Sequence, residues 1–156
     1  MTQRKLKLNK KFVPAPRNIG DELFPNGFFE FNITELIKFI YENQFQPQLV
    51  QINSLSILGA DRLDVVTVCN ANLSIPIILA EISPNSFNVI DGHHRLERAR
   101  RECADEILAY KISAEQHINF LTSVMAYESY VQYWNEKLKS RRIATTKTGQ
   151  KDFKIP

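Results

Sequence analysis

The segment that most constrains the fold of this chain is FNVIDGHHRLERARRE, at residues 87–102. Its first four residues include three that favour a β-strand, and the Asp-Gly pair at residues 91–92 favours a turn. From His94 onward the apolar residues recur with helical spacing instead of alternating. The segment therefore predicts a strand that turns directly into a helix, with two of the chain's three histidines at that turn.

The neighbouring segments predict the rest of a small mixed α/β (α+β) domain. Residues 75–82, IPIILAEI, and residues 106–113, EILAYKIS, are short apolar runs typical of strands. Residues 48–58 predict a further strand of uncertain register, which ends before Gly59. The segment at residues 60–74 is ambiguous because β-branched residues favour a strand, but a short helix capped by Asp61 or Asp64 is the favoured interpretation.

The N-terminal third predicts an irregular arm followed by a helix. Residues 1–27 hold three of the seven prolines and two of the five glycines, which indicates an arm that lies against the domain. In NITELIKFIYEN, Asn32 stands where an N-cap belongs, Glu35 follows three residues later, and the aliphatic residues share one helical face.

The C-terminal third predicts one long amphipathic helix or a kinked pair. Ser113 and Gln116 have the spacing of a capping box. An apolar stripe then recurs at spacings of four and three, and comprises Phe120, Val124, Tyr127, Val131, Trp134 and Leu138. The favoured interpretation is that the stripe covers one side of the sheet, and the alternative is a homodimer contact.

Chain length and composition fit one globular domain. Of its 156 residues, we expect 1–47 to form the N-terminal arm and helix, 48–113 the core, 114–140 the C-terminal helical segment and 141–156 a tail. Cys69 and Cys103 have no metal-site spacing and predict small buried residues.

The charge and hydropathy pattern bear on location and partners. The longest apolar run is six residues, so no membrane span or signal peptide is expected, and a cytoplasmic location follows as the default. A net charge of +3 does not indicate a bulk nucleic-acid binder. The basic ends are interpreted first as solvated segments and second as phosphate-seeking arms.

The turn at residues 91–95 carries the chemistry. A strand that feeds a helix N-terminus through a glycine presents unpaired N–H groups, which favour bound phosphate. Gly92 would let a ligand approach the backbone, Arg95 would donate to phosphate oxygens, and His93 and His94 could move protons near neutral pH. Asp91 could hold a divalent metal or orient a histidine. The alternative is that Asp91 caps the helix, Gly92 serves the turn, and the histidines pack or face water; the residues alone leave both interpretations open.

A zinc site is the weaker possibility for the two histidines. Adjacent helical residues point in different directions, so His93 and His94 would not readily share one metal ion. The sequence has neither a cysteine pair nor an HExxH motif to complete a tetrahedral site.

The run PIILAEISPNSFNVIDGHHRLERARRECADEILAYKIS, residues 76–113, resembles the ParB/sulfiredoxin fold superfamily. In that superfamily a Pro-Ile strand, a second strand, a G-x-x-R helix entrance and a further strand follow in this order. The resemblance covers about 65 residues if it is extended back to Gln48, and it implies a small mixed sheet with flanking helices.

The variants of this superfamily differ at the turn. Sulfiredoxins have G-G-C-H-R with a catalytic cysteine, whose position is His93 here, so sulfiredoxin activity is not expected. Partition proteins have G-E-R-R-x-R, which binds the triphosphate of CTP, followed by a helix-turn-helix reader for which this chain is too short. A ParB-like DNA-associated protein or nuclease is therefore less favoured, and a nuclease would need a metal cluster that one assured carboxylate does not supply.

The motif D-G-H-H-R at residues 91–95 is most similar to that of the ADP-dependent serine kinase branch, in which this loop holds the nucleotide phosphates. The resemblance implies that Asp91, His93 and His94 are catalytic, and that residues 92–95 bind phosphate. Asp91 would be the metal ligand. The glutamate base of that branch has no clear counterpart, and the additional carboxylates in question are Asp61, Asp64 and Glu81.

The sequence thus predicts a protein that binds a nucleotide (ADP, ATP or CTP) with Mg²⁺, or another phosphorylated small molecule. Mg²⁺-dependent phosphotransfer or nucleotide hydrolysis at the turn is the expected activity, and His93 or His94 could act as the base. The alternative is a non-catalytic module for nucleotide sensing or protein interaction.

Overall fold

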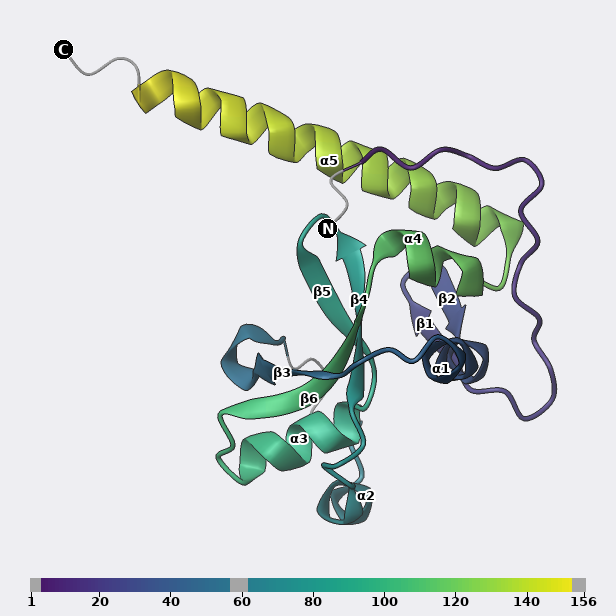
Figure 1. Ribbon diagram of the computed structural model, residues 1–156, viewed down its shortest axis with the longest axis vertical. Helices are drawn as coiled ribbons and strands as arrows, with labels where there is room; N and C mark the ends of the chain where they lie inside the picture. The colour runs from purple at the N-terminus through teal and green to yellow at the C-terminus, as the bar shows by residue number, and fades with distance from the viewer. Residues whose placement is uncertain (1–3, 57–61, 153–156) are drawn as a thin grey trace.

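A four-stranded mixed sheet forms the centre of the protein. The computed structural model describes residues 4–56 and 62–152, with side chains described as far as residue 142. The strand order is β3 (Gln48–Gln51), β6 (Glu106–Ile112), β4 (Ile77–Ser83) and β5 (Ser86–Asp91). The β4 and β6 strands are parallel, and the other two pairings are antiparallel. The predicted α+β class with a mixed sheet is confirmed (Figure 1).

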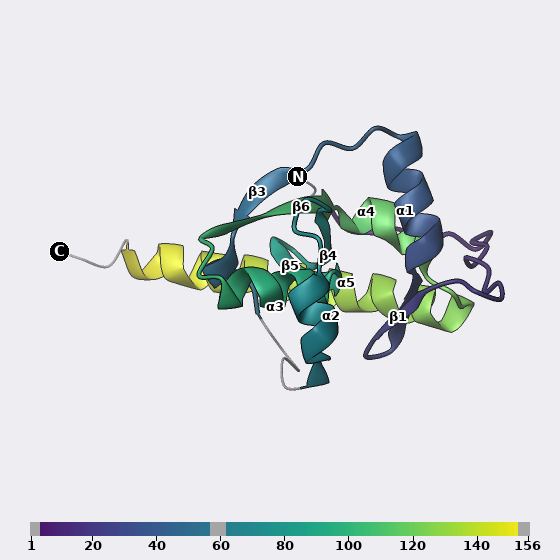
Figure 2. The same ribbon diagram turned by 90° about the horizontal axis from the view of Figure 1, so that it is seen from below.

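Helices cover both faces of this sheet. On one face, α3 (His93–Arg101) packs against the sheet and against α2 (Val65–Asn70). The other face carries α1 (Ile33–Glu42), α4 (Ala114–His117), α5 (Val124–Asp152) and a hairpin of β1 (Leu23–Asn26) and β2 (Phe29–Asn32) (Figures 1 and 2).

The β4 strand is apolar from Ile77 to Ala80 because both of its faces are covered there. Ile77 and Leu79 belong to the core under α3, whereas Ile78 and Ala80 belong to the core on the side of α1 and α5. All four side chains are buried. This alternation explains why residues 75–80, IPIILA, are a continuous apolar run in the sequence and not an alternating one.

The predicted helix caps are present. The Asn32 side chain accepts a hydrogen bond from the N–H of Glu35 at 3.0 Å at the start of α1. Asp64 caps α2 by accepting from the N–H of Thr67 at 3.0 Å. Ser113 begins α4 with a complete capping box.

The N-terminal arm lies along α5, as Figure 1 shows in purple. The Asn135 side chain accepts from the Leu6 N–H at 2.8 Å and donates to the Leu6 carbonyl at 3.0 Å. The indole N–H of Trp134 donates to the carbonyl of Arg4 at 2.9 Å. The arm is not irregular throughout residues 1–27, because β1 lies within it and pairs with β2.

The C-terminal third is kinked and not a single helix: α4 continues into a 3₁₀ turn, η3 (Ile118–Phe120), before α5 begins. Of the apolar stripe, Tyr127, Val131, Trp134 and Leu138 are buried, Phe120 is half-buried and Val124 is exposed. The stripe thus packs within the chain, and a homodimer contact could use little of it. The α5 helix continues to Asp152, past residue 140 where the sequence suggested a tail.

Two other expectations were wrong. The strand predicted for residues 48–58 ends at Gln51, because its partner β6 begins at Glu106 opposite that residue, and η1 (Ile52–Ser54) follows. Cys69 and Cys103 are exposed, not buried. Among the described helices, none combines the length and the apolar composition that a membrane span requires.

Candidate functional site

The turn between β5 and α3 has the predicted strand-to-helix geometry. β5 ends at Asp91, Gly92 stands at the N-cap position with φ +99°, and α3 begins at His93. No side chain makes a capping hydrogen bond at this N-cap. The first turn of α3 therefore keeps backbone N–H donors for a ligand or water, and the expectation that Asp91 might cap the helix is not met.

Gly92 is required by packing against β4. A Cβ atom at this position would lie 2.5 Å from Ile77 Cγ2 and 2.9 Å from Ile77 Cβ. Its positive φ is also unfavourable for any residue with a side chain. The glycine is thus explained without a ligand.

Arg95 is engaged within the protein. Its Nη1 donates to the carbonyl of Pro76 at 2.7 Å and to that of Ile75 at 3.1 Å, while Nη2 pairs with Asp91 Oδ2 at 3.0 Å. The side chains of Arg95 and Asp91 are each only 15% exposed. Arg95 therefore fixes the end of β5 to the entrance of β4, and it would have to give up these bonds to bind phosphate directly.

The two histidines have different surroundings. His93 is half-buried and stacks on Phe24 of β1, with ring centroids 5.4 Å apart. Burial lowers the pKa of His93, so its imidazole is neutral at pH 7. His94 lies near Asp64, the cap of α2. The pKa of Asp64 is lowered mainly by hydrogen bonds from Thr67, with a smaller contribution from His94.

Glu22 is a member of the site that the sequence did not suggest. Partial burial raises the pKa of its carboxyl, the negative charge of Asp91 raises it further, and Arg95 opposes this. Its backbone is held at the start of α1, where the N–H donates to Thr34 Oγ1 and the carbonyl accepts from Ile33, each at 2.8 Å. The sequence gave no signal for this position because Glu22 precedes the hairpin, in the part expected to be irregular.

Of the other proposed carboxylates, one lies near the turn, one lies far from it and one is outside the described residues. Asp64 lies near His94, as described above. Glu81 is buried near the far end of β4, where it accepts from the N–H of Asn85 at 3.1 Å and of Ala114 at 3.4 Å. Asp91 pairs with Ile78 near the opposite end of that strand, so Glu81 belongs to a different place. Asp61 lies outside the described residues.

The charge density of α3 has an internal explanation. The carboxylate of Glu97 is 1% exposed and accepts from Arg100 Nη2 at 2.7 Å and from Arg101 Nε at 2.8 Å. Hydrogen bonds from Arg100 are the main cause of its lowered pKa. Arg98 pairs with Glu102 at 2.8 Å. These pairs join residues three or four apart on one helix, a spacing that the sequence indicates for Glu97 with Arg101 and for Arg98 with Glu102.

Metal ligands are sparse at the turn. Within the described parts of the chain, no group of three or more His, Cys, Asp and Glu side chains is placed to hold a metal ion. Glu22 and Asp91 form a pair of carboxylates at most. This number is too small for a nuclease-type cluster but is compatible with Mg²⁺, which often takes one or two carboxylates together with phosphate oxygens and water.

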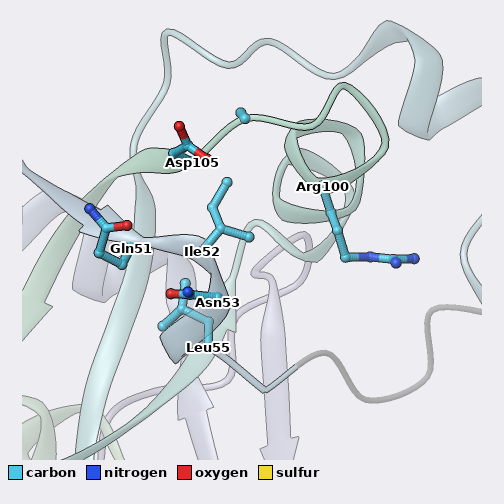
Figure 3. Close-up of a pocket in the computed structure, with 7 residues that line it drawn as sticks. Gln51, Ile52, Asn53, Leu55, Arg100 and Asp105 are labelled. Carbon is cyan, nitrogen blue, oxygen red and sulfur yellow. The ribbon is translucent and has the colours of Figure 1, made fainter.

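Two hollows are relevant to ligand size. A cavity of about 30 Å³ adjoins Asp91 and Arg95, between Tyr41 and Tyr110, and holds about one water molecule. A hollow of about 290 Å³ lies at the other end of α3 (Figure 3), lined by Gln51, Ile52, Asn53, Leu55, Arg100, Ala104 and Asp105. Arg100 points away from the other residues in Figure 3, in keeping with its pairing to Glu97. The cavity beside Asp91 and Arg95 is thus too small to hold a nucleotide.

Comparison with known protein families, curated proteins and solved structures finds no match for this chain. The resemblance to the ParB/sulfiredoxin superfamily therefore stays a prediction, drawn from residues 76–113.

Proposed function

We propose that the N-terminus of α3 binds the phosphate groups of a nucleotide, or of another phosphorylated small molecule, as a magnesium complex. The observation that carries this proposal is the uncapped start of α3 beside the carboxylates of Glu22 and Asp91. Backbone N–H groups and the helix dipole favour the phosphate oxygens.

Magnesium is part of the proposal because of the local charges. Among the side chains that the structure describes at this turn, the carboxylates of Glu22, Asp64 and Asp91 outnumber the guanidinium of Arg95, so a bare phosphate would meet net negative charge. Burial is the main cause of the raised pKa of Glu22, and repulsion between its charge and that of Asp91 adds to it. A divalent cation held by Glu22 and Asp91 would remove this repulsion and neutralise phosphate charge.

The histidines supply the chemistry for a reaction. Transfer of a phosphoryl group to a hydroxyl or to water needs a group that accepts a proton. His94 is the better candidate, because His93 is occupied by its stack on Phe24. Asp64 is the carboxylate placed near His94.

The alternative of a non-catalytic nucleotide sensor is favoured by one observation. Gly92 and Arg95, which a phosphate-binding turn would use, are both engaged in contacts within the protein. Such a turn could bind a nucleotide without being built to react with it.

Calorimetric titration with ADP, ATP and CTP, each with and without Mg²⁺, tests the binding proposal. We expect Mg²⁺-dependent binding that Glu22→Gln weakens by at least about tenfold, which corresponds to about 1.4 kcal/mol. Glu42→Gln is the matched control, since Glu42 is an exposed carboxylate at the end of α1. Binding of none of the three nucleotides by the wild type would refute a nucleotide as the ligand.

Product analysis separates the enzyme from the sensor. If the protein is an enzyme, His94→Ala should abolish nucleotide turnover and leave calorimetric binding measurable. If the wild type binds nucleotide but gives no product with water or with hydroxyl acceptors, the sensor is the better description. Arg95→Ala is a poor test, because the variant would lose three internal hydrogen bonds.

A further inference from the structure

The basic N-terminal arm lies along α5, the helix that carries the basic residues of the C-terminal third. Running from Asn9 to Arg4, the arm passes Tyr127, whose hydroxyl accepts from the Asn9 N–H at 2.7 Å, and then Asn135 and Trp134. The arm thus lies antiparallel to α5 and approaches the C-terminal half of that helix (Figure 1).

The side of α5 that faces the arm carries further cations. Lys139 and Arg142 follow Asn135 by four and seven residues, so the three share one side of the helix. Because Asn135 and Trp134 hold the backbone of Leu6 and Arg4, Lys139 lies about one helical turn beyond the point where the described arm contacts α5, and Arg142 about one turn further.

The arm presents its own cations to solvent. Leu6 is buried against the core, whereas Lys5 and Lys7 on either side of it are exposed. We name the basic surface as the exposed residues Arg4, Lys5, Lys7, Lys10, Lys11, Lys139 and Arg142.

Charge is concentrated on this surface. It holds seven of the chain's 20 basic residues. Two acidic residues of α5 lie near it by helical spacing: Glu128, seven residues before Asn135, and Glu136, directly after it. Its local charge of about +5 exceeds the net charge of +3 for the whole chain, so the remainder is slightly acidic.

We propose that the basic surface binds the phosphate backbone of a double-stranded nucleic acid without sequence preference. An extended row of lysine and arginine side chains matches a linear polyanion, and neutralising its phosphates releases counterions. Base stacking is not expected, because Phe12 and Tyr127 beside the arm stack on each other with centroids 3.9 Å apart and Trp134 is buried.

A duplex fits this surface better than an anionic membrane does. A helix that binds a membrane surface inserts an apolar face among the lipids. The apolar face of α5 is occupied, since Tyr130, Trp134 and Leu138 are buried in the core.

Fluorescence anisotropy with labelled duplexes of about 20 base pairs tests the proposal on the full-length protein. If about five phosphates are contacted, the logarithm of the association constant should fall with the logarithm of salt concentration with a slope of about −4.5. Duplex DNA and duplex RNA are compared directly, and a preference for either identifies the ligand. Vesicles containing anionic lipid form the third arm.

A triple variant, Lys5→Gln, Lys7→Gln and Lys139→Gln, localises the binding. It should weaken binding at about 0.1 M salt by at least about tenfold and reduce the salt slope by about 2.7. The control removes three exposed cations elsewhere, through Lys38→Gln, Arg62→Gln and Lys111→Gln, and should change affinity much less. Circular dichroism and the thermal midpoint verify that both triple variants are folded. If one of them is not folded, its three single-substitution variants are tested instead.

Three results would overturn the proposal. The first is failure of the wild type to bind any duplex at low salt, and the second is binding to vesicles but to no duplex. Equal losses in the two triple variants would show that net charge, and not this surface, determines binding.

Discussion

Gly92 shows how one residue determines the geometry of the candidate site. Substitution by alanine would force a side chain into a left-handed conformation and press its Cβ against Ile77 at 2.5 Å. We expect Gly92→Ala to lower the free energy of unfolding by about 2 to 4 kcal/mol, measured by urea denaturation.

Gly27 is a matched control for this substitution. It has φ +65°, but a Cβ there would meet no atom within 4 Å. Gly27→Ala should therefore cost only the backbone strain, about 1 kcal/mol. Equal losses at the two positions would mean that contact with Ile77 contributes nothing.

His117 is a buried histidine that makes stability depend on pH. Its Nε2 lies 2.7 Å from the carbonyl oxygen of Glu81, and burial lowers its pKa to about 4. The unfolded chain binds a proton near pH 6.5, whereas the folded protein does so only near pH 4. The stability from the neutral imidazole is therefore fully present above pH 6.5 and is lost as the pH falls from 6.5 to 4.

We expect this loss to be on the order of 3 kcal/mol, measured by urea denaturation between pH 7.5 and pH 4. His117→Leu should remove most of the pH dependence that histidine contributes, although it also lowers stability at neutral pH. His93, whose pKa is lowered too, contributes in the same direction. A wild-type dependence equal to that of His117→Leu would contradict the assignment.

At the level of elements, the C-terminal end of α3 contains backbone strain that a glycine would remove. The N–H of Ala104 donates to the carbonyl of Ala99 at 3.0 Å, and that of Cys103 donates to Arg100 at 3.1 Å. These two bonds form a Schellman motif, whose αL position is occupied by Cys103 with φ +57°. Cys103→Gly should raise the free energy of unfolding by about 1 kcal/mol, whereas Cys103→Ala should not.

The elements that the sequence predicted well are those specified by local signals. The caps at Asn32, Asp64 and Ser113 lie within three residues of the groups that they bind, so the sequence shows both partners. The predicted length of β3 was wrong because the strand ends where its partner β6 begins, and β6 lies more than fifty residues away in the sequence. No local pattern contains that information.

The same distinction between local and long-range signals applies to the candidate site. The turn at residues 91–95 was found because strand, glycine and helix are contiguous. The engagement of Arg95 by Ile75 and Pro76, and the approach of Glu22 to Asp91, depend on how β4 and the arm are placed in space. Long-range packing therefore determines which of the expected phosphate ligands remain available.

At the scale of the whole molecule, the attachment of the arm to α5 depends on a few polar contacts. The side chain of Asn135 makes two hydrogen bonds to the backbone of Leu6, which lies 129 residues away in the sequence. Asn135→Ala would leave the Leu6 N–H and carbonyl without these partners. We expect a loss of about 1 to 3 kcal/mol and local opening of the arm.

Limited trypsin digestion measures this opening, because the arm carries cleavage sites at Lys5, Lys7, Lys10 and Lys11. Asn135→Ala should be cut in the arm several-fold faster than the wild type, as followed by mass spectrometry. Gln132→Ala is the control on the same helix, since Gln132 is exposed and bonds only to Glu136 among the contacts described. If both variants are cut at the wild-type rate, the Asn135 bonds do not hold the arm. Attachment would then depend on the buried side chain of Leu6 and on the stack of Phe12 with Tyr127.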